Sequence, residues 1–227
     1  MLQKKITIAK HENMHTNKYI DRLRKVVKDC SGMSDQDFDL SIPYWQHKIY
    51  KKGEFFNEYK NVCKYLGFVL DGVFRIYRFH DQSGIEKNMF FFTRDQFMCS
   101  FKGFFNQNSC EYYTQSLINS EILYIHFNNL QHLYKISPVW DRFGRIFAES
   151  SLLAMMTNTE AVMFKSPEER YQELVSVHPD VFNSVPLYHI ASYLGIKGPS
   201  LSRIRKRIVG NENSISVDTT TSVEVEK

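Results

Sequence analysis

Hydrophobic and polar positions between residues 45 and 127 alternate in short runs that turn signals separate. The apolar and aromatic runs 65–70, 73–79 and 88–92 are each followed within a few residues by aspartate or glycine. Regular strand and turn spacing without intervening helices predicts an antiparallel sandwich or jelly roll. Asp71-Gly72 lies between two of these runs and predicts a hairpin, because both central positions of a type I′ turn adopt positive φ.

Two further stretches carry apolar residues at helical spacing. Residues 17–30 predict a first helix, and Ser34 is placed to cap a short second one. Residues 128–164 predict one long helix with apolar positions close to heptad spacing. Such a stripe needs a partner, so we expect the helix to pair with a parallel copy of itself, unless it packs on its own barrel. The expected dimerisation residues are Ile136, Val139, Trp140, Phe143, Ile146, Phe147 and Leu153.

The segment 185–208 has the pattern of two short helices joined by a glycine turn. Small Ala191 allows the helices to approach closely, and Gly195 lies where the chain turns sharply and positive φ is favoured. Six apolar residues are spaced to pack the two helices together: Ile190, Leu194, Ile196, Leu201, Ile204 and Ile208. This pattern predicts a DNA-binding helix-turn-helix.

The second helix of this motif is strongly basic. No acidic residue lies between Lys197 and Ile208, and the face opposite the apolar residues presents hydroxyl and cationic groups that suit base edges and phosphates. The alternative is a basic amphipathic helix on a protein or membrane surface, or a solvated charge run. We expect Arg203 to read a base. The candidate DNA-binding residues are Lys197, Ser200, Ser202, Arg203, Arg205, Lys206 and Arg207.

Composition narrows the class of protein. The chain has 227 residues and a formal net charge of +4, which alone does not indicate nucleic-acid binding. Residues 1–20 are polar and charged, so we expect no signal peptide, and no apolar run is long enough to span a membrane. We therefore expect a soluble protein of the cytoplasm.

Residue types that hold metals or carry out catalysis are not grouped in the sequence. The four cysteines show no zinc-like spacing, and the eight histidines include no His-x-His pair within a strand. No G-x-S-x-G, Walker or dinucleotide-binding motif is present. We expect no metal, no cofactor and no enzymatic activity.

The patterns divide the chain into five parts. Residues 1–18 form a polar lead-in, 19–132 the β-roll domain, 133–164 the dimerisation helix, 165–210 the helix-turn-helix domain and 211–227 an acidic tail. Ser166 and Glu169 form a capping box that begins the fourth part. The expected fold class is α+β: a jelly-roll-like antiparallel β-roll, a long dimerisation helix and a C-terminal helix-turn-helix.

The order of these elements resembles the Crp/Fnr superfamily of bacterial transcription regulators over residues 37–208. The most similar motifs are residues 166–171 (SPEERY) and the helix-turn-helix segment, whose sequence is similar to the branch common in Bacteroidetes-type bacteria. The resemblance implies a cyclic-nucleotide-binding-like effector domain and a dimerisation helix. It also implies a winged helix-turn-helix that binds double-stranded DNA at a palindromic promoter site and contacts RNA polymerase.

Particular residues depart from the family pattern. The family's guanine-reading arginine falls on Arg203, whereas Gly198 and Pro199 replace an arginine and a glutamate at the start of the recognition helix. No clear pair of strands for a wing follows Ile208. Base preference should therefore differ from that of the cyclic-AMP-responsive members.

The effector pocket is also altered. Its candidate residues are Phe97, Cys99, Cys110 and Glu111, and Glu111 lies near the position of the family's phosphate-binding arginine, where it would repel a phosphate. We expect no cyclic-nucleotide binding in the usual mode, and the effector stays open. Only Cys30 precedes the barrel, which excludes an N-terminal iron–sulfur cluster. The alternative to a DNA-binding regulator is a small-ligand-binding interaction module whose helix-turn-helix does not bind DNA.

Overall fold

The computed structural model of the chain describes residues 18–218, with side chains up to Ile208. The fold consists of two compact units, the first ending at Thr159 and the second beginning at Glu160. The predicted polar lead-in over residues 1–18 lies outside the described residues except for its last position, and so do residues 219–227 of the predicted tail.

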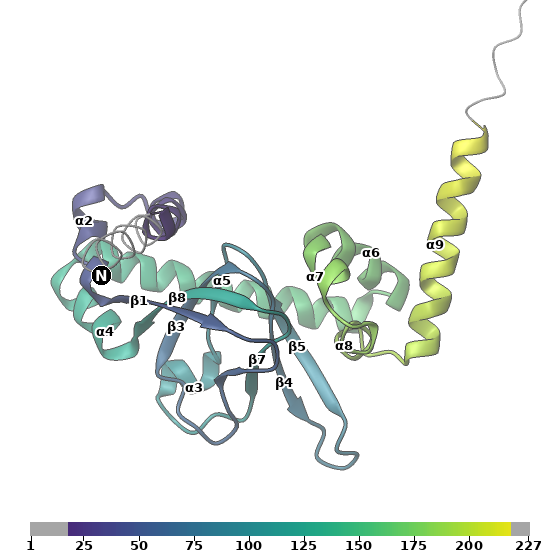
Figure 1. Cartoon of the computed structure of the whole chain (residues 1–227), viewed down its shortest axis with the longest axis horizontal. Helices are drawn as coiled ribbons and strands as arrows, with labels where there is room; N and C mark the ends of the chain where they lie inside the picture. Colours follow the sequence, from purple (N-terminus) through teal and green to yellow (C-terminus); the bar gives the residue numbers. More distant parts are fainter. Residues whose placement is uncertain (1–17, 219–227) are drawn as a thin grey trace, which may run out of the picture. The chain divides into compact units, whose positions relative to one another are not determined.

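The first unit is built on two four-stranded antiparallel sheets, with strand orders β1-β8-β3-β6 and β2-β7-β4-β5 (Figure 1). Phe68, Phe74 and Ile122 are fully buried members of its core. The predicted jelly-roll-like β-roll is confirmed. Its strands are β1 (Trp45–Tyr50), β2 (Phe55–Asn57), β3 (Tyr65–Asp71), β4 (Phe74–Phe79), β5 (Glu86–Phe92), β6 (Phe97–Met98), β7 (Tyr113–Ser116) and β8 (Ser120–His126).

The Asp71-Gly72 turn does not form the hairpin that the sequence predicts. The strands on either side, β3 and β4, belong to different sheets, so this turn carries the chain from one sheet to the other. Gly72 has a φ of +105°, but Asp71 does not have positive φ, and a type I′ turn requires it at both positions. A Cβ atom on Gly72 would lie 2.1 Å from Ser120 Oγ, so close packing against β8 also requires glycine.

A cation is buried within the second sheet. Arg75 of β4 is only 3% exposed. Its guanidinium group donates to Gln115 Oε1 on β7 at 2.7 Å, and also to Glu86 and Asn88 on β5. The centre of the group lies 3.7 Å from the centroid of the Tyr77 ring. The network therefore joins β4 to both of its neighbours.

Helices surround the β-roll core. The described part of the first helix covers residues 18–31, close to the prediction, and Ser34 accepts the predicted cap hydrogen bond from Asp37 N. Leu23 and Phe38 are fully buried in the core cluster of the unit. The remaining helices of this unit are α2 (Asp35–Asp39), η1 (Ile42–Tyr44), α3 (Phe101–Asn106), α4 (Phe127–Ile136) and the larger part of α5 (Pro138–Phe164).

The single long helix predicted over residues 128–164 is two helices. The chain leaves helical geometry at Ser137, which has φ −140° and ψ 114°, and α5 begins at Pro138. Proline lacks a backbone N–H and disfavours helical geometry in the residue before it, so the break follows directly from the sequence.

The second unit contains the end of α5 and four further helices. The predicted capping box is confirmed: Ser166 Oγ accepts from Glu169 N, and the Glu169 carboxylate accepts from Ser166 N. His178 is both the C-cap of the first of these helices and the N-cap of the second. The helices are α6 (Pro167–Val177), α7 (Pro179–Ser184), α8 (Leu187–Tyr193) and α9 (Gly198–Asp218).

The end of α9 differs from the prediction. The sequence pattern predicts a helix-turn-helix segment that ends at Ile208 and an acidic tail from residue 211, whereas α9 continues to Asp218. Residues 209–218 contain no proline and a single glycine, Gly210, which costs a helix only about 1 kcal/mol. Residues 209–218 belong to α9, so they do not form the strands of the wing that the family resemblance implies. Within residues 18–218, no helix has the length and apolar character needed to cross a membrane.

Candidate nucleic-acid interface

The helix-turn-helix is formed by α8, the turn after it and the start of α9. Gly195 has a φ of +68°, which confirms the predicted turn residue. Ala191 is buried where the two helices meet, and Ile196 and Ile208 are half-buried. The predicted packing is therefore confirmed. The other apolar residues of the motif are also buried: Ile190, Leu194, Leu201 and Ile204.

Arg203 and Lys206 lie away from this apolar contact, whereas Arg205 borders it, four residues after Leu201. Because successive residues of a helix are about 100° apart, Lys206 lies almost opposite Leu201 and Ile204, with Ser202 and Arg203 on either side of it. Ser200 is half-buried. The other six predicted DNA-binding residues are exposed: Lys197, Ser202, Arg203, Arg205, Lys206 and Arg207. The arrangement presents cationic and hydroxyl groups on one helix face, and their contact with DNA stays a prediction.

One of these cations has a partner within the unit. Arg207 Nη1 donates to Glu168 Oε2 at 2.6 Å, which links α9 to the first turn of α6. Lys206 lies about 100° further around the helix, away from this ion pair. A phosphate that binds Arg207 must therefore compete with a carboxylate, so we expect Arg207 to contribute less to phosphate binding than Lys206 does.

A second arginine, which the sequence pattern did not predict, supports the motif. Arg170 Nη2 donates to the carbonyl oxygen of Leu194 at 2.8 Å, immediately before the Gly195 turn. Arg170 Nη1 donates to the carbonyl oxygen of Lys165 at 2.9 Å. The position of Arg170 in the SPEERY motif was the one sequence signal that could have drawn attention to it. The residues around Arg170 do not indicate a contact with Leu194, which is 24 residues away.

The predicted dimerisation stripe needs correction in its first half. Trp140 and Phe143 are fully buried in the core of their own chain, where Phe143 lies 5.3 Å from Phe97 between ring centroids. Phe147 packs on the same cluster. These residues therefore have little or no surface to offer a second copy, and the alternative of packing on the β-roll applies to them. Half-buried Val139 packs against the same cluster, and Ile146 is half-buried.

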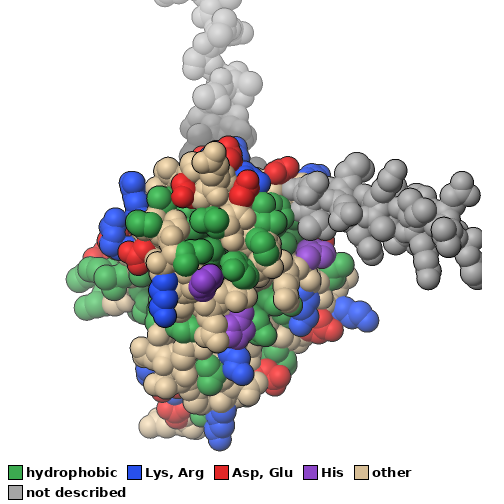
Figure 2. All heavy atoms as spheres, turned by 90° about the vertical axis from the view of Figure 1, so that its left-hand side faces the viewer, with side chains coloured by type: hydrophobic (Ala, Val, Ile, Leu, Met, Phe, Trp, Pro, Cys, Tyr) green, Lys and Arg blue, Asp and Glu red, His purple; other side chains and the backbone are tan. Residues whose placement is uncertain are grey.

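Ile136 also lies elsewhere than predicted. It belongs to α4, before the break at Ser137, and is 49% exposed. The face of the first unit in Figure 2 has hydrophobic side chains interspersed with lysine, arginine, aspartate and glutamate side chains.

The second half of α5 exposes large apolar side chains. Leu152 is 59% exposed and Met156, one turn later, is 50% exposed. Together with Leu153 and Met155, which are also exposed, they form what we call the exposed α5 stripe. Of the residues predicted to dimerise, only Leu153 belongs to it. In the second unit, the last turn of α5 likewise exposes Val162, Met163 and Phe164.

None of the four predicted pocket residues lines the cavity described below, which is lined by residues 55–58 and 60–65. Phe97, Cys99 and Cys110 are largely or fully buried, and Phe97 packs on rings of α5. Glu111 is exposed and pairs with Lys102 at 3.2 Å. Aromatic side chains of the chain itself occupy the space between β5, α3 and α5. They include Phe90, Phe92, Phe101 and Phe147.

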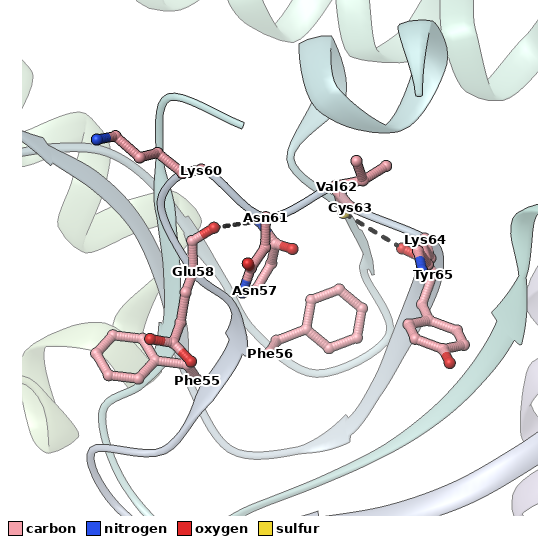
Figure 3. Close-up of a pocket in the computed structure, with 10 residues that line it drawn as sticks. All are labelled: Phe55, Phe56, Asn57, Glu58, Lys60, Asn61, Val62, Cys63, Lys64 and Tyr65. Atoms are coloured by element: carbon pink, nitrogen blue, oxygen red, sulfur yellow. Dashed lines mark hydrogen bonds between the residues drawn. The ribbon is translucent and has the colours of Figure 1, made fainter. Parts of the chain in front are cut away.

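A cavity of about 480 Å³ lies elsewhere, at the loop between β2 and β3. Figure 3 shows its lining, in which Phe56 and Tyr65 supply rings and Asn57 supplies an amide. Cys63 is the one cysteine that lines it, and burial raises the pKa of this thiol to about 11. The thiol is therefore protonated at neutral pH, which does not favour a nucleophile or a metal ligand. Among the described residues, no three His, Cys, Asp or Glu side chains are grouped to hold a metal ion.

Known proteins of similar structure identify the fold of the chain. No protein-family model matches the sequence, and no curated protein matches it. FixK2 from Bradyrhizobium japonicum is similar in structure with a TM-score of 0.64 and 15% identity, over 74% of this chain and 86% of that one. CLP, a c-di-GMP-responsive global regulator of Xanthomonas campestris, has a TM-score of 0.60 and 16% identity, over 79% and 93% of the two chains.

A third similar structure names the family. A protein from Eubacterium rectale assigned to the Crp/Fnr family of transcriptional regulators has a TM-score of 0.61 and 14% identity, over 79% of this chain and 85% of that one. Each match spans both units, because none could cover that share of the chain with the first unit alone. The chain therefore has the fold of the Crp/Fnr transcription regulators.

Proposed function

We propose that the chain is a homodimeric transcription regulator that binds double-stranded DNA at a specific palindromic site. The observation that carries the proposal is the exposed basic face of α9, which follows the positive-φ turn at Gly195 and is backed by buried Leu201 and Ile204. A helix of this kind fits the major groove, and its cations can neutralise phosphates on both sides.

Individual residues have different roles in this proposal. Arg203, assisted by Ser200 and Ser202, reads base edges. Lys197, Arg205 and Lys206 bind phosphates, and Arg207 assists them when it leaves Glu168. A homodimer would place two such helices on half-sites about 34 Å apart, one turn of B-form DNA. The protein would act in the cytoplasm and, once bound to a promoter, would contact RNA polymerase.

The exposed α5 stripe supports the dimer. Four large apolar side chains within five residues of one helix are exposed to water, which is energetically unfavourable. A parallel copy of the same helix would bury them. The aromatic rings of α3, β5 and α5 support the absence of cyclic-nucleotide binding in the usual mode, because they pack on one another and fill the space between these three elements.

The test begins with selection of binding sites from a pool of random duplex DNA by the full chain. Affinity for the selected site is then measured by fluorescence anisotropy at several salt concentrations. Arg203→Ala should cost about 1–3 kcal/mol at one base-pair position and relax specificity there. Arg94→Ala is the control, because Arg94 is an exposed arginine of the first unit that lies outside α5 and α9 and pairs with Asp71.

Three outcomes would contradict this assignment. If Arg203→Ala weakens all DNA sequences equally, Arg203 binds phosphate and does not read a base. If affinity does not fall with added salt, the cations of α9 do not bind phosphates. If the selection yields no enriched sequence, the helix-turn-helix belongs to an interaction module that does not recognise DNA.

A further inference from the structure

Arg170 connects the ends of two helices in the second unit. Its Nη1 donates to the carbonyl oxygen of Lys165, the residue after α5, at 2.9 Å and, more weakly, to those of Ala161 and Val162 in the last turn of α5 at 3.4 Å. Its Nη2 donates to the carbonyl oxygen of Leu194, the C-cap of α8. One side chain on α6 therefore holds the end of α5 and the end of α8 together.

The chemistry of helix ends explains why an arginine lies there. The last carbonyl groups of a helix have no partner within the helix and carry the negative end of its dipole. Arg170 offers its cation to two such ends at once, and a planar guanidinium group can bind in two directions where an ammonium group binds as a point. Its Nε–H is buried without a hydrogen-bond partner in the structure, so this position is set by the two helix ends.

The position of this contact matters for recognition. The Leu194 carbonyl is followed by Gly195, whose positive φ turns the chain toward α9. The carbonyls on the other side belong to the last turn of α5 and to Lys165 directly after it, and α5 is the helix whose exposed stripe is proposed to pair in the dimer. The contact therefore lies between the element proposed to dimerise and the element proposed to enter DNA.

We propose that Arg170 is a positioning residue that fixes the orientation of the helix-turn-helix relative to the end of α5, and thereby sets the spacing of half-sites that the dimer recognises. The proposal rests on the proposed function. Each added base pair turns the second half-site by about 34° around the DNA axis, so only a fixed orientation gives a sharp preference for one spacing. Without Arg170, α8 and α9 keep their own buried contacts but lose this tie to α5.

The first experiment measures spacing preference with the full chain. Arg170→Met removes the guanidinium group and keeps an unbranched apolar side chain. Binding is measured to the selected site, to sites with one base pair inserted or deleted at the centre, and to a single half-site. The wild-type chain should lose about tenfold or more in affinity when the spacing changes, because both half-sites can no longer be engaged at once.

The variant should behave differently in two ways. Arg170→Met should lose about threefold or less on the same change of spacing, while its affinity for a single half-site stays within about twofold of wild type. Arg94→Met, at an exposed arginine outside α5, should keep the wild-type preference. A variant with unchanged spacing preference overturns the proposal. A fall in half-site affinity as large as that for the full site also overturns it, because Arg170 then acts on the helix-turn-helix itself.

A second experiment does not depend on DNA. Spin labels are placed at Glu160→Cys and Ser202→Cys, two exposed positions of the second unit, with exposed Cys30 replaced by serine. The other cysteines are buried, and dilution with unlabelled chain leaves only the distance within one chain. The distance distribution should be narrow with Arg170 and clearly broader with Arg170→Met at an unchanged far-ultraviolet circular dichroism spectrum.

The two experiments separate the two proposals. A chain that binds no DNA but shows the broadened distribution would refute the proposed function and leave the positioning role of Arg170 standing. A distribution that stays narrow in Arg170→Met would refute the positioning role, whether or not the chain binds DNA.

Discussion

Replacing Leu152 with aspartate tests the proposed dimer at the exposed α5 stripe. Leu152 and Met156 are four residues apart, so they are neighbours on the same face of the helix. In the single chain, 59% of Leu152 and 50% of Met156 are exposed. The substitution therefore should not disturb the β-roll core, but it should remove apolar area that a second copy would cover.

The exposed fraction gives the expected magnitude. Burying a whole leucine side chain contributes about 1.5–3 kcal/mol, so the 59% of Leu152 that is free for a partner is worth about 1–2 kcal/mol. A symmetric dimer loses this twice, a total of about 2–4 kcal/mol, which raises the dimer Kd roughly 30-fold to several hundredfold. Two carboxylates brought into an apolar contact add to the loss.

Sedimentation velocity across a range of protein concentrations measures this Kd. Ala154→Asp is the control: it introduces the same charge at an exposed residue of the same helix, two positions on and therefore about 200° around the axis. The control should stay dimeric. The reasoning is wrong if Leu152→Asp associates as tightly as wild type, or if both variants dissociate alike, since the latter would show that charge anywhere on α5 opposes the dimer.

Three further predictions follow from the packing and charge of named residues. Phe143→Ala should lower the free energy of unfolding, measured in urea, by about 3–5 kcal/mol, because Phe143 is a core residue. Phe164→Ala, at a 78% exposed site, should change it by less than about 0.5 kcal/mol. Equal effects of the two substitutions would contradict the assignment of Phe143 to the core. Burial lowers the pKa of His178, despite the opposing charge of Asp180, so the neutral form stabilises the second unit and stability should fall as pH drops below 6.5. His178→Gln should flatten that dependence, and a titration with the wild-type slope would reject it. Lys206→Ala removes one phosphate contact per half-site and should reduce the salt slope of DNA binding by about 2 per dimer, more than Arg207→Ala does; the reverse order would show that Glu168 does not hold Arg207 back.

The parts predicted well from sequence depend on local signals. The capping box at Ser166 and the turn at Gly195 involve residues within a few positions of one another, and the structure has both as expected. The buried stripe of Leu201 and Ile204 likewise follows from spacing along one helix. Local backbone preferences and the helical repeat are enough to find such features.

The parts predicted badly depend on contacts between distant segments. Asp71-Gly72 has turn chemistry, but whether β3 and β4 pair is decided by β8 and β7, which lie far along the chain. Similarly, heptad spacing cannot distinguish Phe143, which packs on the β-roll, from Leu152, which is exposed, because the spacing alone does not show what each part of an amphipathic helix packs against. The break before Pro138 was available from the sequence alone.

The buried guanidinium group of Arg75 has a consequence for how the second sheet assembles. Successive side chains of a strand point to opposite faces, so a slip of β4 by one residue would turn this cation toward the apolar interior that holds Phe74 and Ile76. That misalignment would separate the cation from Gln115 and Glu86 and cost several kcal/mol. Arg75 thus fixes the register between β4 and its neighbours. It thereby disfavours alternative pairings of the phenylalanine-rich edge strand β5, which would favour aggregation.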